Sequence, residues 1–207
     1  MQVLTEYRIK TRDGTGYHAY TLWDGLGQQQ LAEVEEYEHW LRNTIELPGY
    51  IKVVLSNFVP ATLVCAEQTS SLTTRQTLFS VHEETAGLQL RYAVSNAHGV
   101  LLGPVQAPKI HLTDEVKFNN ALVLEVLNPQ LQPIAALMGD WDKQNYRLMD
   151  ASGTPLGSVI KDNANELYWS GDYRLQLNTP PEHEQHFLFL SMVIMLDWME
   201  RTWADEE

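Results

Sequence analysis

The sequence predicts a mainly β (α+β) protein: a closed antiparallel β-barrel of about twelve strands around a buried, hydrophobic C-terminal helix. Three observations lead to this prediction. Short apolar segments alternate with turn residues at near-regular intervals, which is typical of sandwiches and barrels. One hairpin motif recurs along the chain. A single segment near the end of the sequence is apolar on every helical face, and such a helix has to be buried.

The hairpin motif occurs twice at identical spacing, over residues 92–105 and 146–159. Both copies read Tyr-x-Val/Leu-x-Asn/Asp-Ala-x-Gly-x-x-Leu-Gly-x-Val. The alternating start predicts a strand with one buried face, the Asn or Asp opens a turn, and the first Gly can adopt positive φ. A weaker copy begins at Tyr20 and keeps the spacing through Leu22, Asp24 and Gly27, after which the register slips.

Two further hairpins are predicted between these copies. The strands Tyr50–Ser56 and Ala61–Ala66 flank a turn that contains a proline, and Leu122–Leu127 and Ile134–Met138 flank a loop with one asparagine and two prolines. Because proline and asparagine favour turns over strand interiors, each pair is interpreted as two antiparallel neighbours.

The central helix is expected over about residues 180–203. The segment 179–182, Thr-Pro-Pro-Glu, has an N-capping residue, a proline at the first helical position and a glutamate three residues after the cap. The following run Phe187–Leu196 is apolar except for Ser191. A membrane span needs about 20 apolar residues, and Asp197 ends this run too early, so burial inside the barrel is favoured.

Length and composition indicate one domain over residues 1–207. A chain of 207 residues buries enough surface to fold without a disulfide or a metal. The polar stretch Thr69–Thr74 is too short for a linker and is interpreted as a loop. Cys65 is the single cysteine, and the segment Met1–Lys10 has no apolar signal-peptide core, so we expect a reducing, cytoplasmic location.

The formal net charge is −13, from 14 Lys and Arg against 27 Asp and Glu. Such a field repels phosphate backbones and anionic lipid surfaces. No stretch of the sequence gathers several Lys or Arg residues. The charge therefore argues against nucleic acid, disfavours phospholipid and favours a basic protein as partner.

The pattern of residues 146–161, followed by the strand-like Asp172–Leu177 and the apolar helix ending Leu196-Asp197, resembles the tubby-like superfamily. The likeness is best over Tyr92–Trp203 and is closest to the LURP-one-related and phospholipid-scramblase-related proteins. It implies a twelve-stranded barrel wound around its C-terminal helix. It also implies links to phosphoinositide or phospholipid binding, calcium-dependent lipid scrambling and plant defence.

Two departures from that pattern bear on the lipid activities. The scramblase calcium segment is acid-rich, whereas the matching stretch Ser170–Thr179 keeps only Asp172. The proline-rich arm, the acylated cysteine cluster and the clustered Lys and Arg of phosphoinositide binders have no counterpart in this sequence. The resemblance thus carries over the fold better than the activity.

No residue is assigned a catalytic, cofactor-binding or metal-binding role, no cofactor is expected, and the binding residues are left unassigned. His183 and His186 lack the spacing and adjacent glutamate of zinc proteases and are expected to be exposed at the helix start. The segment Asp162–Glu166 lacks the alternating ligands of an EF-hand and is interpreted as an exposed loop. Cys65, in an apolar strand, is interpreted as a buried, inert thiol.

An acidic cluster and six tryptophans complete the candidates. The glutamates are interpreted as a solvated strand face, with docking of a basic protein as their functional alternative: Glu33, Glu35, Glu36 and Glu38. Trp198 and Trp203 are expected to pack at the barrel mouth. The remaining tryptophans lie near predicted turns, where a surface groove is the alternative to ordinary packing: Trp23, Trp40, Trp141 and Trp169.

These observations favour a non-enzymatic binding or scaffold domain with a protein partner. The first alternative is peripheral phospholipid binding or a scramblase-like role, which the family resemblance implies. The second alternative is an acidic inhibitor or immunity-type protein that masks a basic partner. An enzyme with its site in an open barrel end ranks last, because the sequence contains no catalytic constellation.

Overall fold

The computed structural model describes residues 3–11, 19–36, 62–67, 76–86, 89–107, 121–139, 144–162, 172–182 and 184–204. These residues form twelve strands and one helix. The strands and the helix are β1 (Glu6–Thr11), β2 (Ala19–Asp24), β3 (Gln30–Glu36), β4 (Thr62–Glu67), β5 (Gln76–Ala86), β6 (Gln89–Asn96), β7 (Leu101–Gln106), β8 (Ala121–Leu127), β9 (Pro133–Gly139), β10 (Asn145–Asp150), β11 (Pro155–Asp162), β12 (Asp172–Leu177) and α3 (Gln185–Ala204).

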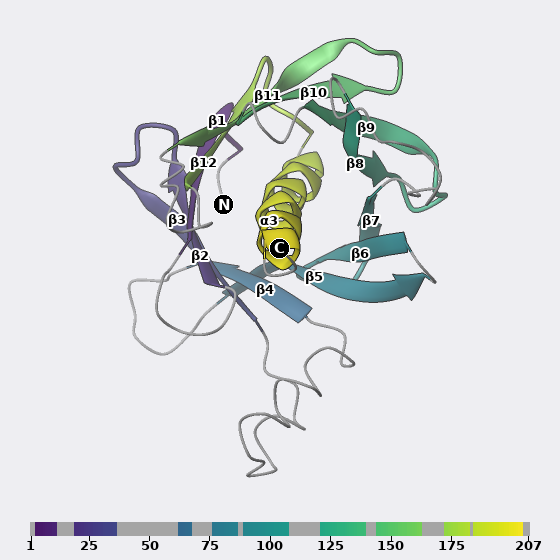
Figure 1. Ribbon diagram of the computed structural model, residues 1–207. Coiled ribbons are helices and arrows are strands. Elements are labelled where there is room, and N and C mark those ends of the chain that lie inside the picture. Colours follow the sequence, from purple (N-terminus) through teal and green to yellow (C-terminus); the bar gives the residue numbers. More distant parts are fainter. Residues whose placement is uncertain are drawn as a thin grey trace.

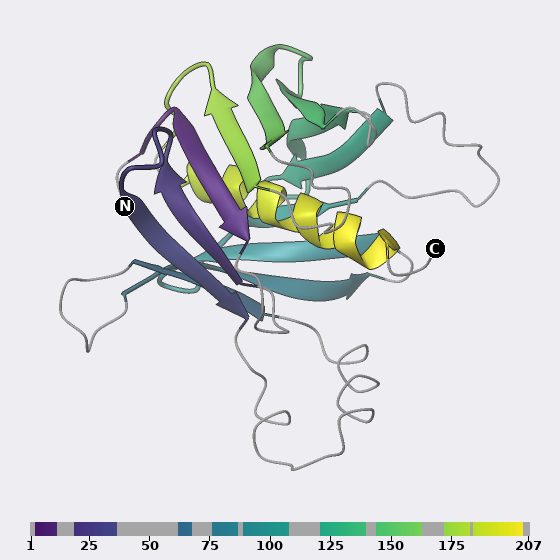
Figure 2. The same ribbon diagram turned by 60° about the vertical axis from the view of Figure 1, so that its left-hand side comes forward.

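The twelve strands of the described residues close into one barrel. Each strand pairs antiparallel with the next strand in sequence, and β1 closes the ring by pairing antiparallel with β12. Figure 1 views the barrel along its axis and shows α3 inside the ring of strands. Figure 2 shows from the side how the helix runs through the barrel. The predicted closed antiparallel barrel around a C-terminal helix is confirmed.

Alternation along each strand decides which side chains enter the barrel. In β12, Tyr173, Leu175 and Leu177 are buried while the residues between them are partly exposed, and β1 buries Tyr7 and Ile9 in the same way. Successive side chains of a strand point to opposite faces, so a period of two produces one apolar lining.

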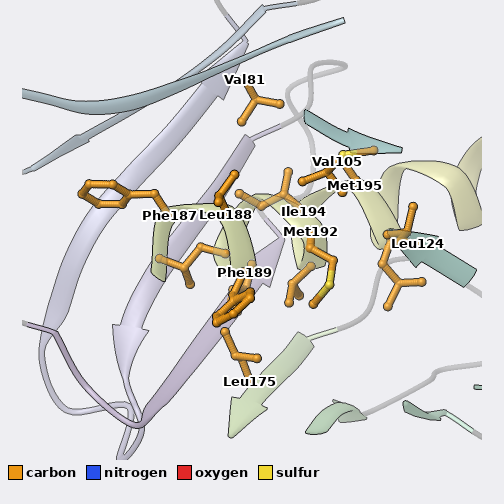
Figure 3. Packing of buried hydrophobic residues seen from close by; sticks show 14 of the residues in the cluster. Val81, Val105, Leu124, Leu175, Phe187, Leu188, Phe189, Met192, Ile194 and Met195 are labelled. Carbon is orange, nitrogen blue, oxygen red and sulfur yellow. The ribbon is translucent and has the colours of Figure 1, made fainter. Parts of the chain in front are cut away.

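The helix α3 fills the interior with the apolar run that the sequence predicts to be buried. Every residue from Phe187 to Leu196 is buried, and side chains from several strands surround the helix (Figure 3). The one polar residue of the run, Ser191, donates its hydroxyl to the carbonyl oxygen of Phe187 at 2.7 Å. Among the described residues, no helix has the length and apolarity that crossing a membrane requires.

The helix begins at Gln185, so the predicted start at Thr179 and Pro180 is wrong. A residue that precedes proline is disfavoured in the α conformation, and here both Thr179 and Pro180 precede one. The chain makes single turns instead: the amide of Gln185 donates to the carbonyl of Glu182 at 3.0 Å.

Antiparallel winding divides the connections between the two ends of the barrel. Among the connections that the structure describes, those that follow even-numbered strands lie at one end, where β12 also leads into α3. We call this end the turn end and define it by residues 24–29, 96–101, 128–133, 150–155, 178–182 and 184.

Candidate binding surface

His186 is fully buried, so its interpretation as an exposed residue is wrong. Its ring lies 3.9 Å from that of Phe187 and stacks nearly parallel to that of Tyr7 at 6.5 Å between centroids. Because α3 begins only at Gln185, His186 enters the barrel within the first helical turn. His183 lies outside the described residues.

Cys65 points into the barrel from β4 and is buried, as predicted. Burial raises the pKa of its thiol well above the ordinary value, because the thiolate would lose its hydration. The thiol is therefore protonated at neutral pH, and a protonated thiol is a poor nucleophile.

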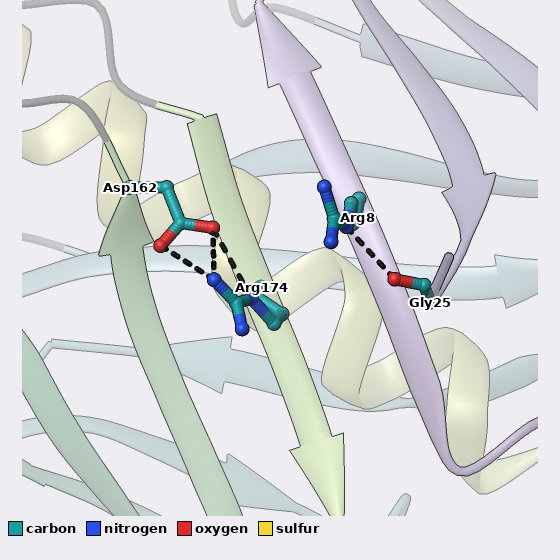
Figure 4. Close-up of polar contacts among 4 residues, drawn as sticks. All are labelled: Arg8, Gly25, Asp162 and Arg174. Atoms are coloured by element: carbon teal, nitrogen blue, oxygen red, sulfur yellow. Dashed lines mark hydrogen bonds and ion pairs between the residues drawn. The ribbon is translucent and has the colours of Figure 1, made fainter. Parts of the chain in front are cut away.

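Asp162 is the last residue of β11 and not part of a loop, which corrects the interpretation of that segment. Its carboxylate accepts bonds from Arg174 of β12, from Nη2 at 2.7 and 2.8 Å and from Nε at 3.1 Å (Figure 4). These bonds raise the pKa of Arg174. Residues 163–166 of the predicted loop lie outside the described part of the chain.

Arg174 lies directly opposite Arg8 of β1 on the outer face of the barrel. Arg8 in turn donates from Nε to the carbonyl of Gly25 at 2.8 Å, and both arginines appear in Figure 4. On the same outer face the ammonium of Lys10 lies 5.1 Å from the ring of Trp23. Three acidic residues on β1, β12 and the adjoining β11 balance these cations: Glu6, Asp172 and Asp162.

The acidic cluster follows the alternation of β3. Glu33 and Glu35 are partly exposed between the buried Ala32 and Val34, which agrees with an outward strand face. The side chain of Glu36 and all of Glu38 lie outside the described residues.

The tryptophans that the structure describes have ordinary packing partners. Trp198 is partly buried, and its ring lies 5.3 Å from that of Tyr92. Trp23 donates its indole N–H to the hydroxyl of Thr21 at 3.0 Å on the outer face of β2. The side chain of Trp203 and three whole residues lie outside the described part: Trp40, Trp141 and Trp169.

One buried polar contact had no signal in the sequence. Asp197 of α3 is fully buried, and its Oδ2 accepts a hydrogen bond from the hydroxyl of Tyr20 at 3.0 Å. A buried carboxylate is costly unless it is hydrogen-bonded, so this contact favours one position of the helix relative to β2. In the sequence, Asp197 is marked only as the end of the apolar run and as part of the Leu196-Asp197 helix ending.

Four hairpins of the turn end share one turn. Its first residue is Asp24, Asn96, Asn128 or Asp150, and in each case Oδ1 accepts the backbone amide four residues on at 2.7–3.0 Å. The carbonyl of the same residue accepts the amide three residues on. These hydrogen bonds satisfy the backbone amides of the turn within the turn itself and make it rigid.

The residue three positions after the Asn or Asp has positive φ in all four turns. It is a glycine in three of them, Gly27, Gly99 and Gly153, and a leucine in the fourth, Leu131, with φ of 63°. The fourth copy lacks most of the motif, because Leu124 replaces the tyrosine, Leu131 the glycine, and Ile134-Ala135 the Leu-Gly pair. The copy at Asp24 loses the spacing of the motif because its turn is one residue longer: the amide of Asp24 donates to the carbonyl of Gln29.

The glycine of each Leu-Gly pair, Gly103 or Gly157, lets two neighbouring backbones approach closely. An added Cβ on Gly103 would lie 1.9 Å from the carbonyl oxygen of Leu127, and one on Gly157 would lie 2.0 Å from that of Gln176. Gly103 thus brings the β6–β7 hairpin against β8, next to the turn that contains Leu131.

The large hydrophobic side chains that are exposed among the described residues all lie on the turn end. Leu26 is 74% exposed, Val100 57%, Leu101 41% and Leu131 53%. Elsewhere in the described part, large apolar side chains are buried or half-buried. Single exposed leucines are common, but Val100, Leu101 and Leu131 lie on neighbouring hairpins, and adjacent exposed apolar side chains are typical of a contact surface. Leu26 lies on the β2–β3 turn, several strands away around the ring.

The described residues that define the turn end include four carboxylates and no Lys or Arg, and Arg8 of β1 reaches this end through its bond to Gly25. The carboxylates are Asp24, Asp150, Glu182 and Glu184, and Glu184 accepts a hydrogen bond from the side-chain amide of Asn96 at 2.8 Å. Hydrogen bonds from Ser152 and Thr154 lower the pKa of Asp150, so it carries its charge at neutral pH.

The described residues define a twelve-stranded antiparallel β-barrel that encloses its own C-terminal helix. The fold is similar to that of an Arabidopsis thaliana protein known from its X-ray structure. The TM-score is 0.52 with 14% sequence identity, over 94% of this chain and 90% of the other. At this identity the likeness concerns the fold. No protein-family model matches the sequence, and no curated protein matches it.

Proposed function

We propose that this protein is a non-enzymatic binding or scaffold module of the tubby-like class, in the LURP-one-related and scramblase-related branch, that acts through a protein partner. The observation that supports the proposal most is the filled interior. Barrels that bind small ligands hold them inside the ring, where here α3 places Phe187–Leu196. Recognition therefore falls to the outer surface.

The charge supports a protein rather than a lipid or nucleic acid as partner. A net charge of −13 repels anionic surfaces, and the outward Arg8, Lys10 and Arg174 are balanced by neighbouring carboxylates. A cytoplasmic location belongs to the same proposal and rests on the single, buried Cys65.

Affinity capture of the full chain from its source cells tests the proposal. We expect a stoichiometric protein partner whose retention falls as salt rises, because screening weakens contacts between opposite charges. Purified protein mixed with anionic liposomes, with and without calcium, should fail to co-sediment. A specific turnover by the pure protein, abolished by a single polar substitution, would refute a non-enzymatic role.

A further inference from the structure

We infer that the turn end is the docking surface of this protein, and that it receives a partner protein whose contact face has apolar pockets flanked by Lys or Arg. The inference rests on the proposed binding function and assigns that function to one end of the barrel.

The first argument is the arrangement of the exposed apolar side chains. Gly103 holds the β6–β7 hairpin against β8, so Val100 and Leu101 lie on the hairpin next to the one that carries Leu131. All three project from turns fixed by Asn96 or Asn128. A preorganised apolar patch loses little conformational entropy on binding.

The second argument is the backbone of Leu131. A leucine is disfavoured at positive φ, and three equivalent positions have glycine, which adopts that conformation freely. The leucine side chain is also half exposed, so it gains little from burial in the free protein. Strain of this kind, without a packing gain in the free chain, points to a contact made in a complex.

The third argument is charge. The described residues that define the turn end include four carboxylates and no Lys or Arg, and the guanidinium of Arg8 borders this end at Gly25. Anionic membranes attract clusters of Lys and Arg, whereas the described residues of this end carry mostly carboxylates. Basic groups on a protein partner would complement the carboxylates while its pockets receive the leucines.

Two synthetic peptides of equal length, one of Leu and Lys and one of Leu and Glu, test the chemistry. Titrated into the labelled full chain, the Leu/Lys peptide should shift the backbone amide NMR signals of Leu26, Val100, Leu101 and Leu131. The Leu/Glu peptide should bind at least about tenfold more weakly. Shifts confined to the Glu33 and Glu35 face of β3, or equal binding of both peptides, would overturn the inference.

Leu131→Gly separates binding from stability. The variant should bind the Leu/Lys peptide about tenfold more weakly, as expected for the loss of one apolar anchor. The melting temperature of the variant should be equal to or higher than that of the wild type. The control Gln130→Ala lies in the same turn, is exposed, and should leave the affinity unchanged. Equal losses in both variants would contradict a specific role for Leu131. Binding to neutral phosphatidylcholine vesicles that Leu131→Gly abolishes would replace the protein partner with a membrane.

A photo-crosslinking residue at Leu131 or Glu35 distinguishes this inference from the proposed function. We expect the partner recovered by affinity capture to crosslink from position 131 and not from position 35. A partner that crosslinks only from position 35 overturns the docking surface and leaves the binding function standing. A specific turnover by the pure protein would overturn the binding function itself.

Discussion

Ile194 lies at the middle of α3 with no exposed surface, and Ile194→Asp tests whether the helix is solvated by the strands of its own chain (Figure 3). Removing most of a buried isoleucine costs about 2–5 kcal/mol. The new carboxyl has to stay protonated in the core, which costs about 1.4 kcal/mol for each pH unit above its ordinary pKa of about 3.9, or about 4 kcal/mol at pH 7. The total approaches the whole stability of a domain, about 5–15 kcal/mol.

The charge part of this cost has a defined pH dependence. Burial raises the pKa of the new carboxyl in the folded state, so unfolding releases a proton and stability falls as pH rises above about 4. Ile194→Asn has nearly the same size and no charge, so its loss is constant over this range. Urea unfolding at pH 5, 6 and 7 should show the difference between the two variants growing by about 1.4 kcal/mol per pH unit.

The outcome that refutes the reasoning is simple to recognise. If Ile194→Asp melts at the wild-type temperature at pH 7, position 194 is not in an apolar interior. If the Asp and Asn variants are destabilised equally at every pH, the new carboxylate reaches water, and the helix is not enclosed as Figure 1 shows it.

Three further predictions follow from particular contacts. Gly157→Ala should destabilise the fold by about 1–3 kcal/mol or more, because the added Cβ would lie 2.0 Å from a backbone oxygen. Gly153→Ala has open space around the added Cβ but a positive φ, and it should cost about 1–2 kcal/mol in the same thermal unfolding assay. A larger loss for Gly153→Ala than for Gly157→Ala would contradict the close approach of the backbones at Gly157. Tyr20→Phe should cost about 1–3 kcal/mol in urea unfolding, since buried Asp197 loses a donor, and an unchanged midpoint would exclude a stabilising contact. The pKa of Asp150 is lowered in the folded state, so Asp150 contributes stability above the ordinary carboxyl pKa, and this contribution is lost as the pH falls through the folded pKa. Asp150→Asn should therefore make the free energy of unfolding depend less on pH in the acid range. A pH dependence identical to that of the wild type would show that the turn needs no charge.

The barrel and the buried helix were predictable because both rest on periodicity and length. A period of two marks the lining residues of β12, and an apolar run as short as Phe187–Leu196 is too short to span a membrane. The turns after Asn96 and Asp150 were predictable for a similar reason, since each bonds amides within four residues. The family likeness that accompanied these predictions stays a proposal.

The helix start and the environment of His186 were predicted incorrectly. The capping pattern at Thr179 favours a helix start there, but each residue that precedes a proline is disfavoured in the α conformation. The helix therefore begins later, at Gln185. His186 directly precedes the apolar run Phe187–Leu196, but the polar residues His183 and Gln185 before it placed it at an exposed helix start in the prediction.

By itself the sequence determined the strand alternation, the turn chemistry and the need of one helix for an apolar surrounding, because each depends on residues near one another in the chain. Only the tertiary structure decided that Tyr20 meets Asp197, 177 residues away, and that Arg8 faces Arg174. It also decided that Leu26, Val100 and Leu131 share one end. Each of these depends on closing the ring between β1 and β12 and on antiparallel winding, which bring distant residues together without a local signal.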